Sequence, residues 1–228
     1  MISVIVPVYN EEKTLAKVVR KLEKLKLPIS KEIIIINDGS KDKTREILKD
    51  LSKKFKKLKV IDYTLNRGKG FAIRKGIEKS KGEIILIQDA DLEYDLENIK
   101  LLLKEILEKN EKVVYGSRFM KKNNRGKIAF YLGNKFLSMM TSALYLQRVT
   151  DMETCYKMFR REVIENISLK SDRFEIEPEI TAKIIREGYK IKEVPINYSP
   201  RSNKEGKKIK AKDGIIALWT LLKLRVCN

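Results

Sequence analysis

One short stretch of this chain reads Glu83-Ile84-Ile85-Leu86-Ile87-Gln88-Asp89-Ala90-Asp91. Its apolar run shows no alternation with polar residues, which predicts a strand covered on both faces of a parallel sheet. Two carboxylates, Asp89 and Asp91, follow where that strand would end. Because ligands bind beyond the carboxyl ends of the strands in open α/β sheets, the stretch also predicts a binding site at this edge.

The same alternation of strand and helix extends on both sides of this stretch. Further strands are predicted at Ile2–Val6, Glu32–Ile36, Leu58–Asp62 and Lys112–Tyr115, and helices at Thr14–Leu25, Lys43–Phe55, Gly70–Lys79 and Leu96–Lys109. This order indicates an α/β fold whose mostly parallel central sheet has helices on both faces and right-handed crossovers.

The regular alternation of predicted strands and helices ends after Gly116, and the second half of the chain is less regular. It contains helix candidates at Ile128–Gln147, near Pro178 and at Ile215–Leu224, a strand at Lys190–Val194, an irregular stretch around Asp151–Arg160 and a basic tail at Arg201–Lys212. No repeat and no low-complexity linker divides the chain, so a single domain over residues 1–228 is expected.

Charge limits the classes of partner. The chain of 228 residues has 50 Lys and Arg against 31 Asp and Glu, a formal net charge of +19. This excess points to nucleic acid or an anionic membrane surface, so a basic binding protein is the non-enzymatic alternative. No reading helix or set of stacking aromatics is recognisable, and nucleic acid is therefore not the expected partner. Nothing in the sequence predicts the oligomeric state.

Two residue types are absent or rare. The chain has no histidine, which excludes His-based acid–base catalysis, a Ser-His-Asp triad and His-containing zinc sites. Its two cysteines, Cys155 and Cys227, are too few for a disulfide framework, and a reducing cytoplasm is expected. No signal peptide is recognisable in the first residues.

A metal site is one interpretation of the carboxylates after the buried strand. Mg²⁺ or Mn²⁺ typically binds one or two carboxylates together with substrate phosphate oxygens. Asp89, Asp91 and Glu93 form an alternating set that suits such an ion. The competing interpretation is a turn in which they accept backbone N–H groups. The position after a buried strand favours the metal.

Two further strand ends contain candidate residues. Asp38, in Asn37-Asp38-Gly39-Ser40, suits either an Asp-Gly turn or a hydrogen bond from the N–H edge of uracil or guanine. The segment Asn66-Arg67-Gly68-Lys69-Gly70 matches neither the dinucleotide fingerprint nor the ATP-type phosphate loop. A tight turn with close packing at Gly70 and Gly76 is favoured there, over a phosphate contact from Lys69.

Taken in order, these motifs resemble one enzyme family. The chain is similar to the family 2 glycosyltransferases of the GT-A fold, and most to the dolichyl-phosphate mannose synthase group, in Pro7-Val8-Tyr9-Asn10-Glu11, Asn37-Asp38-Gly39-Ser40, Asn66-Arg67-Gly68-Lys69-Gly70, Asp89-Ala90-Asp91 and Tyr115-Gly116-Ser117-Arg118. The resemblance implies a single GT-A (Rossmann-like) domain. Residues 1–118 would form its nucleotide-sugar-binding half, and residues 119–228, with the C-terminal helices, its acceptor- and membrane-side half.

The resemblance also implies a metal-dependent, inverting transfer of a sugar to a polyprenyl (dolichyl) phosphate. Nucleotide-sugar contacts are implied at Pro7, Tyr9, Glu11, Asp38, Gln88, Asp89, Ala90, Asp91, Glu93, Arg201 and Lys207, Mg²⁺ or Mn²⁺ ligands at Asp89, Asp91 and Glu93, and acceptor-phosphate contacts at Arg118, Arg125, Lys127 and Lys135. Asp91 and Arg118 are implied in catalysis. Mannose from GDP-mannose is favoured, with UDP-glucose or UDP-N-acetylglucosamine as the alternative donor.

A phosphate acceptor limits what the enzyme must supply. A phosphate monoester is already ionised near neutral pH, so it needs cations to position it and no general base. A hydroxyl acceptor, the alternative, would need a base, for which Glu177 is the first candidate. Capping of the helix near Pro178 is the favoured interpretation of Glu175, Glu177 and Glu179.

Two low-charge helices bear on the location of the protein. Ile128–Gln147 has Lys135 as its single charge, yet its Gly, Asn, Ser and Thr residues make it poor for spanning a bilayer. This helix and Ile215–Leu224 suit either core packing or the membrane interface, where basic flanks are attracted to anionic lipid. A cytoplasmic enzyme, peripheral at the cytoplasmic membrane face, is the expectation.

Overall fold

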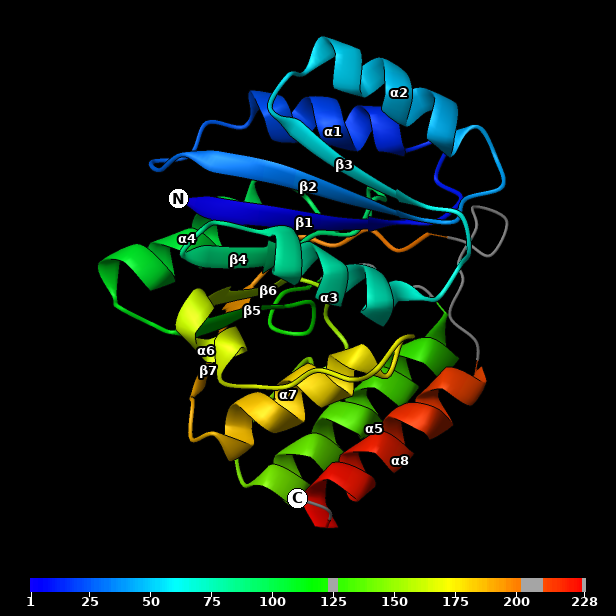
Figure 1. Ribbon diagram of the computed structural model, residues 1–228. Helices are drawn as coiled ribbons and strands as arrows, with labels where there is room; N and C mark the ends of the chain where they lie inside the picture. The colour runs from blue at the N-terminus through cyan, green and yellow to red at the C-terminus, as the bar shows by residue number, and fades with distance from the viewer. Residues whose placement is uncertain (123–126, 202–210, 227–228) are drawn as a thin grey trace.

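The computed structural model describes residues 1–122, 127–201 and 211–226. Its centre is a seven-stranded sheet in the order β3-β2-β1-β4-β6-β5-β7 (Figure 1). The strands are β1 (Ile2–Val8), β2 (Lys31–Asp38), β3 (Leu58–Tyr63), β4 (Ile84–Ile87), β5 (Val113–Ser117), β6 (Lys157–Arg160) and β7 (Ile191–Pro195). Only β6 runs against its neighbours β4 and β5, which confirms the mostly parallel α/β fold.

Helices cover both faces of the sheet. They are α1 (Leu15–Lys24), α2 (Thr44–Lys54), α3 (Lys69–Lys79), α4 (Asn98–Glu108), α5 (Ile128–Tyr145), α6 (Arg161–Glu165), α7 (Ile176–Arg186) and α8 (Ala211–Val226). Strand β4 shows why both faces must be covered. Ile84 and Leu86 pack into the core beneath α1, α2 and α4, whereas Ile85 and Ile87 pack into the opposite core with α3, α5, α6, α7 and α8.

The sequence interpretation is wrong for the end of the stretch Asp151–Arg160, which was expected to be irregular. Residues 157–160 form β6, and α6 follows directly. The strand is short, and its first residue, Lys157, is fully buried against Glu177. A buried lysine looks polar in the sequence, so the pattern lacks the apolar run that marks the other central strands.

The last helices form a layer away from the β3 edge of the sheet. Figure 1 shows α5 and α8 side by side beside α7. The phenol of Tyr145 on α5 donates a hydrogen bond to the carbonyl of Leu221 on α8 at 2.8 Å. Helix α8 begins before and ends after the predicted segment Ile215–Leu224. Within the described residues, no helix combines the length and apolarity needed to cross a bilayer.

Candidate active site

A cavity of about 480 Å³ opens beyond the carboxyl ends of β1, β2 and β4. It takes lining residues from both halves of the chain that the sequence distinguishes, 1–118 and 119–228. The predicted site residues in its wall are Pro7, Tyr9, Glu11, Asp38, Asp89, Ala90, Asp91, Glu93, Arg118 and Arg201. The strand-end rule therefore located the cavity correctly.

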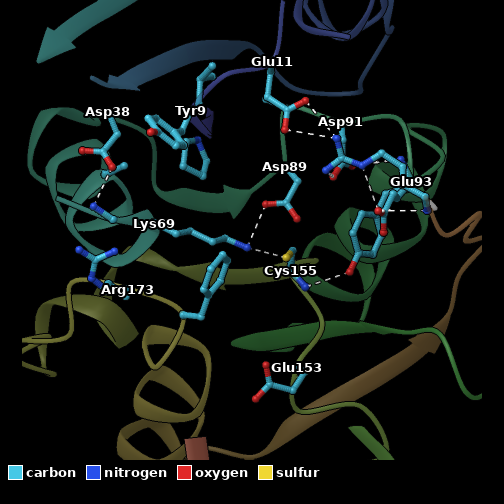
Figure 2. Close-up of a pocket in the computed structure, with 18 of the residues that line it drawn as sticks. Tyr9, Glu11, Asp38, Lys69, Asp89, Asp91, Glu93, Glu153, Cys155 and Arg173 are labelled. Carbon is cyan, nitrogen blue, oxygen red and sulfur yellow. Dashed lines mark hydrogen bonds and ion pairs between the residues drawn. The ribbon is translucent and has the colours of Figure 1, made fainter. Parts of the chain in front are cut away.

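Three carboxylates meet around one guanidinium at the rim of this cavity (Figure 2). Glu11 follows β1, and Asp91 and Glu93 follow the neighbouring strand β4. The guanidinium of Arg201 donates to Asp91 Oδ2 at 2.7 Å, to Glu93 Oε1 at 3.1 Å and to Glu11 Oε2 at 3.1 Å. The phenol of Tyr198 also donates to Glu93, at 2.6 Å. We call the carboxylates of Glu11, Asp89, Asp91 and Glu93 the acidic edge.

A second cation, Lys69, pairs with Asp89, the fourth carboxylate of the acidic edge. The ammonium of Lys69, at the start of α3, lies 2.9 Å from Asp89 Oδ1 and 3.0 Å from Glu177 Oε1. It also donates to Cys155 Sγ at 2.6 Å. Glu177 forms a further ion pair with Lys157, so charges of alternating sign run from the strand β6 to the cavity.

Burial and neighbouring charges set the ionisation of these groups. Burial disfavours the charged form of Asp89, but the ammonium of Lys69, a hydrogen bond from Cys155 and the charge of Arg201 together hold the pKa of that carboxyl below its ordinary value. Burial raises the pKa of Asp91 to about 7, assisted by the negative charges of Asp89 and Glu93 and opposed by Arg201. The two basic residues thus do not fully neutralise the acidic edge, which favours a further positive charge there.

The donors of the acidic edge suit a hard divalent cation. All are carboxylate oxygens, the ligand type that Mg²⁺ and Mn²⁺ prefer, and Arg201 already binds there as a cation. Within the described ranges, no three acidic or sulfur side chains converge closely enough to hold a metal ion by themselves. Such an ion would therefore be held by one or two of Asp89, Asp91 and Glu93 together with oxygens of the bound substrate.

At the far side of the cavity, Asp38 organises the Gly-rich loop. Its carboxylate accepts hydrogen bonds from the backbone N–H groups of Arg67 and Gly68 at 2.9 and 2.7 Å and from the side-chain amide of Asn66 at 2.7 Å. Burial raises the pKa of Asp38 despite these bonds. Asp38 lines the cavity beside Tyr9, so the turn and the nucleobase contact are compatible roles.

The glycines of that loop make room for another segment. A Cβ on Gly70 would lie 2.4 Å from the carbonyl oxygen of Ser171, and Gly68 has φ +116° with a similar approach to Asp172. Close packing at Gly70 is therefore confirmed, and Gly76 packs likewise against Ile5. The segment that packs on these glycines begins at Ser171 and brings Arg173 and Phe174 into the cavity wall. No sequence motif predicted these two residues as part of the site.

The helix α7 does not use its acidic residues as predicted. Its N-cap residue, Glu175, makes no capping hydrogen bond from its side chain. Glu179 instead accepts hydrogen bonds from the backbone of Lys170 and Ser171, at 2.9 and 2.7 Å, and so holds the segment that docks on the Gly-rich loop. Glu177 is paired with two lysines and is absent from the cavity wall, a poor position for a general base.

Arg118 is the predicted acceptor-side cation that lines the cavity. The carboxylate of Asp151 binds its Nε and Nη2, each at 2.7 Å, which fixes the plane of the guanidinium. Burial disfavours its charge, but Asp151, together with Tyr94 and Tyr198, raises the pKa of Arg118 well above its ordinary value. Asp151 is itself placed by Glu193, which accepts hydrogen bonds from the backbone N–H groups of Thr150 and Asp151.

The remaining predicted residues lie elsewhere. Gln88 is fully buried behind the cavity, where it accepts a hydrogen bond from the phenol of Tyr156 at 2.7 Å. Lys127 and Lys135 are exposed at and along α5 and are not part of the cavity wall, although Phe130 and Asn134 of that helix are. Arg125 and Lys207 lie outside the described residues.

The sequence of the chain matches the profile of glycosyl transferase family 2 over residues 3–168, most of its length. The chain belongs to this family. The matched residues include the Gly-rich loop, the acidic edge and Arg118, which are the parts of the cavity wall described above.

Relatives of this family 2 glycosyltransferase include enzymes with polyprenyl-type acceptors in their names. A dolichyl-phosphate beta-glucosyltransferase of Trichomonas vaginalis is 31% identical over 99% of this chain and 73% of its own length. A dolichol-phosphate mannosyltransferase of Pyrococcus furiosus is 30% identical over 90% of this chain and 58% of its own. The chain is thus similar to dolichyl-phosphate sugar transferases of both sugar types.

Solved structures show the same fold. The glucosyl-3-phosphoglycerate synthase of Mycobacterium tuberculosis, in a complex with Mn²⁺, UDP-glucose and phosphoglyceric acid, matches 99% of this chain and 79% of that protein with a TM-score of 0.76 and 17% identity. At this identity, the similarity establishes the GT-A fold of the transferase, as predicted from the sequence.

The pairing beneath the acidic edge predicts a stability effect. Replacing Lys69→Met leaves the half-buried Asp89 without its cation and the buried Glu177 without one of its two, and loss of one member of a buried pair costs about 3–5 kcal/mol of unfolding free energy. Lys75→Met, on the same helix, removes only a surface pair with Glu78 and should cost about 0–1 kcal/mol. Urea unfolding of both variants tests this, and equal costs would contradict the assigned role of Lys69.

Proposed function

We propose that this glycosyltransferase moves a hexose from a nucleotide-sugar to a polyprenyl (dolichyl-type) phosphate, with Mg²⁺ or Mn²⁺ held by one or two of Asp89, Asp91 and Glu93 together with oxygens of the donor. One observation carries the proposal: a single cavity combines the acidic edge with the fixed guanidinium of Arg118. The first group suits a cation and a diphosphate, and the second suits a phosphate. The dolichyl-phosphate transferases among the relatives support this pairing.

The donor would extend from Asp38 toward the acidic edge, with the base near Tyr9 and the diphosphate near Asp91. A bound divalent cation would neutralise the negative charge that develops on the leaving nucleoside diphosphate. Arg201 would leave the carboxylates as that cation binds and would donate its hydrogen bonds to the diphosphate instead. Residues 1–118 thus supply most donor contacts, while Arg201 comes from the second half.

The acceptor phosphate would bind at Arg118, whose orientation is set by Asp151. Its ionised oxygen attacks the anomeric carbon directly, so the reaction inverts that centre and requires no general base. This route agrees with a chain that has no histidine and whose Glu177 is paired with lysines. Lys127 and Lys135 would assist at the approach to Arg118 and not within the cavity.

The donor is proposed to be UDP-glucose before GDP-mannose. The resemblance of the motifs favours mannose, but the relative that matches 99% of this chain is named as a glucosyltransferase. The carboxylate of Asp38 suits the N–H edge of uracil as well as that of guanine. UDP-N-acetylglucosamine stays as a third donor to be tested.

We also propose that α5 and α8 rest on an anionic membrane surface at its cytoplasmic face. Their outward apolar residues recur at helical spacing: Ile128, Leu132, Phe136 and Met139 on α5, and Ile215, Trp219, Leu222 and Val226 on α8. All eight are exposed, Trp219 to 66%. Exposed Lys127, Lys135, Lys212, Lys223 and Arg225 lie on the same helices or at their ends, and they complement anionic lipid.

The transferase activity is tested by counting label in the organic phase. Polyprenyl phosphate and Mn²⁺ are incubated with labelled UDP-glucose, GDP-mannose or UDP-N-acetylglucosamine. One donor should give counts that a chelator abolishes, and Asp91→Asn should lower them about 100-fold or more. Asp50→Asn, an exposed carboxylate on α2, serves as the control and should leave the rate unchanged.

Two results would contradict this function. If nucleotide is released in a metal-dependent way but no label enters the organic phase, the acceptor is not a lipid phosphate, and a hydroxyl acceptor is favoured instead. If neither organic-phase counts nor nucleotide release is seen with any donor, a basic binding protein becomes the better interpretation.

Membrane docking is tested with the single tryptophan of the chain. Adding vesicles that contain phosphatidylglycerol should shift the emission of Trp219 to the blue, because its exposed ring would enter the lipid interface. Neutral vesicles should shift it less. Phe136→Ser with Ile215→Ser should abolish the shift, whereas Leu107→Ser, on α4 beneath the opposite face of the sheet, should not. Equal shifts in all three proteins would contradict the docking surface.

A further inference from the structure

One carboxyl in the cavity wall has no assigned role. Glu153 lies in the segment between α5 and β6 and lines the cavity. Its Oε1 is buried and has no hydrogen-bond partner among the described residues. An unsatisfied buried polar atom costs about 1–3 kcal/mol, and most such atoms in native proteins are paired.

The backbone on both sides of Glu153 is held rigidly. The buried ammonium of Lys157 donates to the carbonyl oxygens of Met152 and Thr154, at 2.9 and 2.5 Å. The hydroxyl of Thr154 donates to the carbonyl of Gly116 at 2.7 Å, and the backbone N–H of Met152 donates to Ser138 Oγ at 3.0 Å. The backbone at Glu153 is therefore held in the wall before any ligand binds, which favours a preorganised contact.

The charges around Glu153 do not compensate its burial. Burial raises the pKa of Glu153 to about 7, and the carboxylates of Glu177 and Asp151 contribute, against the opposing charges of Lys157 and Arg118. A carboxyl retained in such surroundings needs hydrogen-bond donors from outside the protein. Phosphate oxygens offer none when ionised, whereas sugar hydroxyls offer several.

The position of Glu153 fits the sugar of the donor. Figure 2 shows Asp89 and Cys155 between Glu153 and Tyr9, so Glu153 lies farther from the nucleobase end than Asp89 does. A nucleotide-sugar bound with its base near Asp38 and its diphosphate at the acidic edge would have its hexose in this part of the cavity. Arg118 lines the same cavity, and its charge acts on Glu153.

We propose that Glu153 accepts hydrogen bonds from hydroxyl groups of the transferred hexose and thereby contributes to the choice of sugar. The assignment rests on the proposed function, because it requires a nucleotide-sugar in the cavity. It gives the buried Oε1 a partner only when the donor is bound. The acceptor plays no part in it.

The test compares a nucleoside diphosphate with its sugar derivative. With Mn²⁺ present, calorimetry measures the affinity of the wild-type chain and of Glu153→Ala for UDP, UDP-glucose, GDP and GDP-mannose. Glu153→Ala should leave the affinity for the diphosphate within about twofold and weaken that for the nucleotide-sugar about 10-fold or more, since hydrogen bonds to charged groups contribute about 1.5–3 kcal/mol. Glu153→Gln, which keeps one carbonyl acceptor, should lose less.

Stability separates this role from a structural one. Removing an unsatisfied buried carboxyl should leave the melting temperature of Glu153→Ala unchanged or raise it. Glu165→Ala, an exposed carboxylate on α6, is the matched control and should change neither affinity nor stability.

Three outcomes would overturn the assignment. Equal weakening of diphosphate and nucleotide-sugar, or no weakening of either, would remove Glu153 from the sugar contact while leaving the proposed function intact. A lower melting temperature with unchanged ligand preference would make Glu153 a structural residue. Failure of the wild-type chain to bind any nucleotide-sugar would overturn the proposed function and this assignment with it.

Discussion

The carboxylates of the acidic edge repel one another, and their containment by Lys69 and Arg201 is the interaction on which the site depends. The sheet forces them together. Strands β1 and β4 are parallel, hydrogen-bonded neighbours with Ile5 opposite Ile87, so the segments that follow them begin at the same edge of the sheet. The same geometry that makes a binding site at the strand ends makes a concentration of negative charge there.

The two cations hold this charge in different ways. Lys69 is nearly buried and is fixed from behind by Glu177, which is fixed in turn by Lys157. Arg201 is paired with Asp91 and Glu93, two of the carboxylates proposed as ligands of a divalent cation. Lys69 therefore acts as a permanent part of the fold, whereas Arg201 holds a position that a divalent cation suits equally well. A site of this kind would stay folded without the proposed metal and could still bind it.

The sequence predicted the part of the site that depends on strand ends. Asp38, Asp89 and Asp91 follow apolar strands directly, and the topology rule alone brought them together. The contribution of Lys69 was harder to predict, because its partners Asp89, Cys155 and Glu177 come from three separate segments. Arg173 gave no sequence signal, since it reaches the cavity by packing on the glycines of the loop.

The strand β6 was missed for a related reason, because a buried polar residue is not visible in an apolar pattern. Apolar patterning identifies strands whose residues are all apolar in the core, and β6 begins with a lysine that is buried by an ion pair. Gln88 shows the reverse error, because its position beside Asp89 suggested a ligand contact, but its side chain turns inward to Tyr156. The position of a residue in a motif predicts well which segment reaches the cavity, but it predicts poorly which way each side chain points.

The most direct measurement is the affinity of Mn²⁺ for the chain without nucleotide, by calorimetry, in the wild type and in Arg201→Met. If the guanidinium and the divalent cation compete for Asp91 and Glu93, Arg201→Met should bind Mn²⁺ about 10-fold more tightly, a change of about 1.4 kcal/mol. The same variant should bind UDP or GDP more weakly once Mn²⁺ is present, while Arg45→Met, a surface arginine paired with Asp62, should change neither affinity. Unchanged or weaker Mn²⁺ binding by Arg201→Met would contradict the account of the acidic edge.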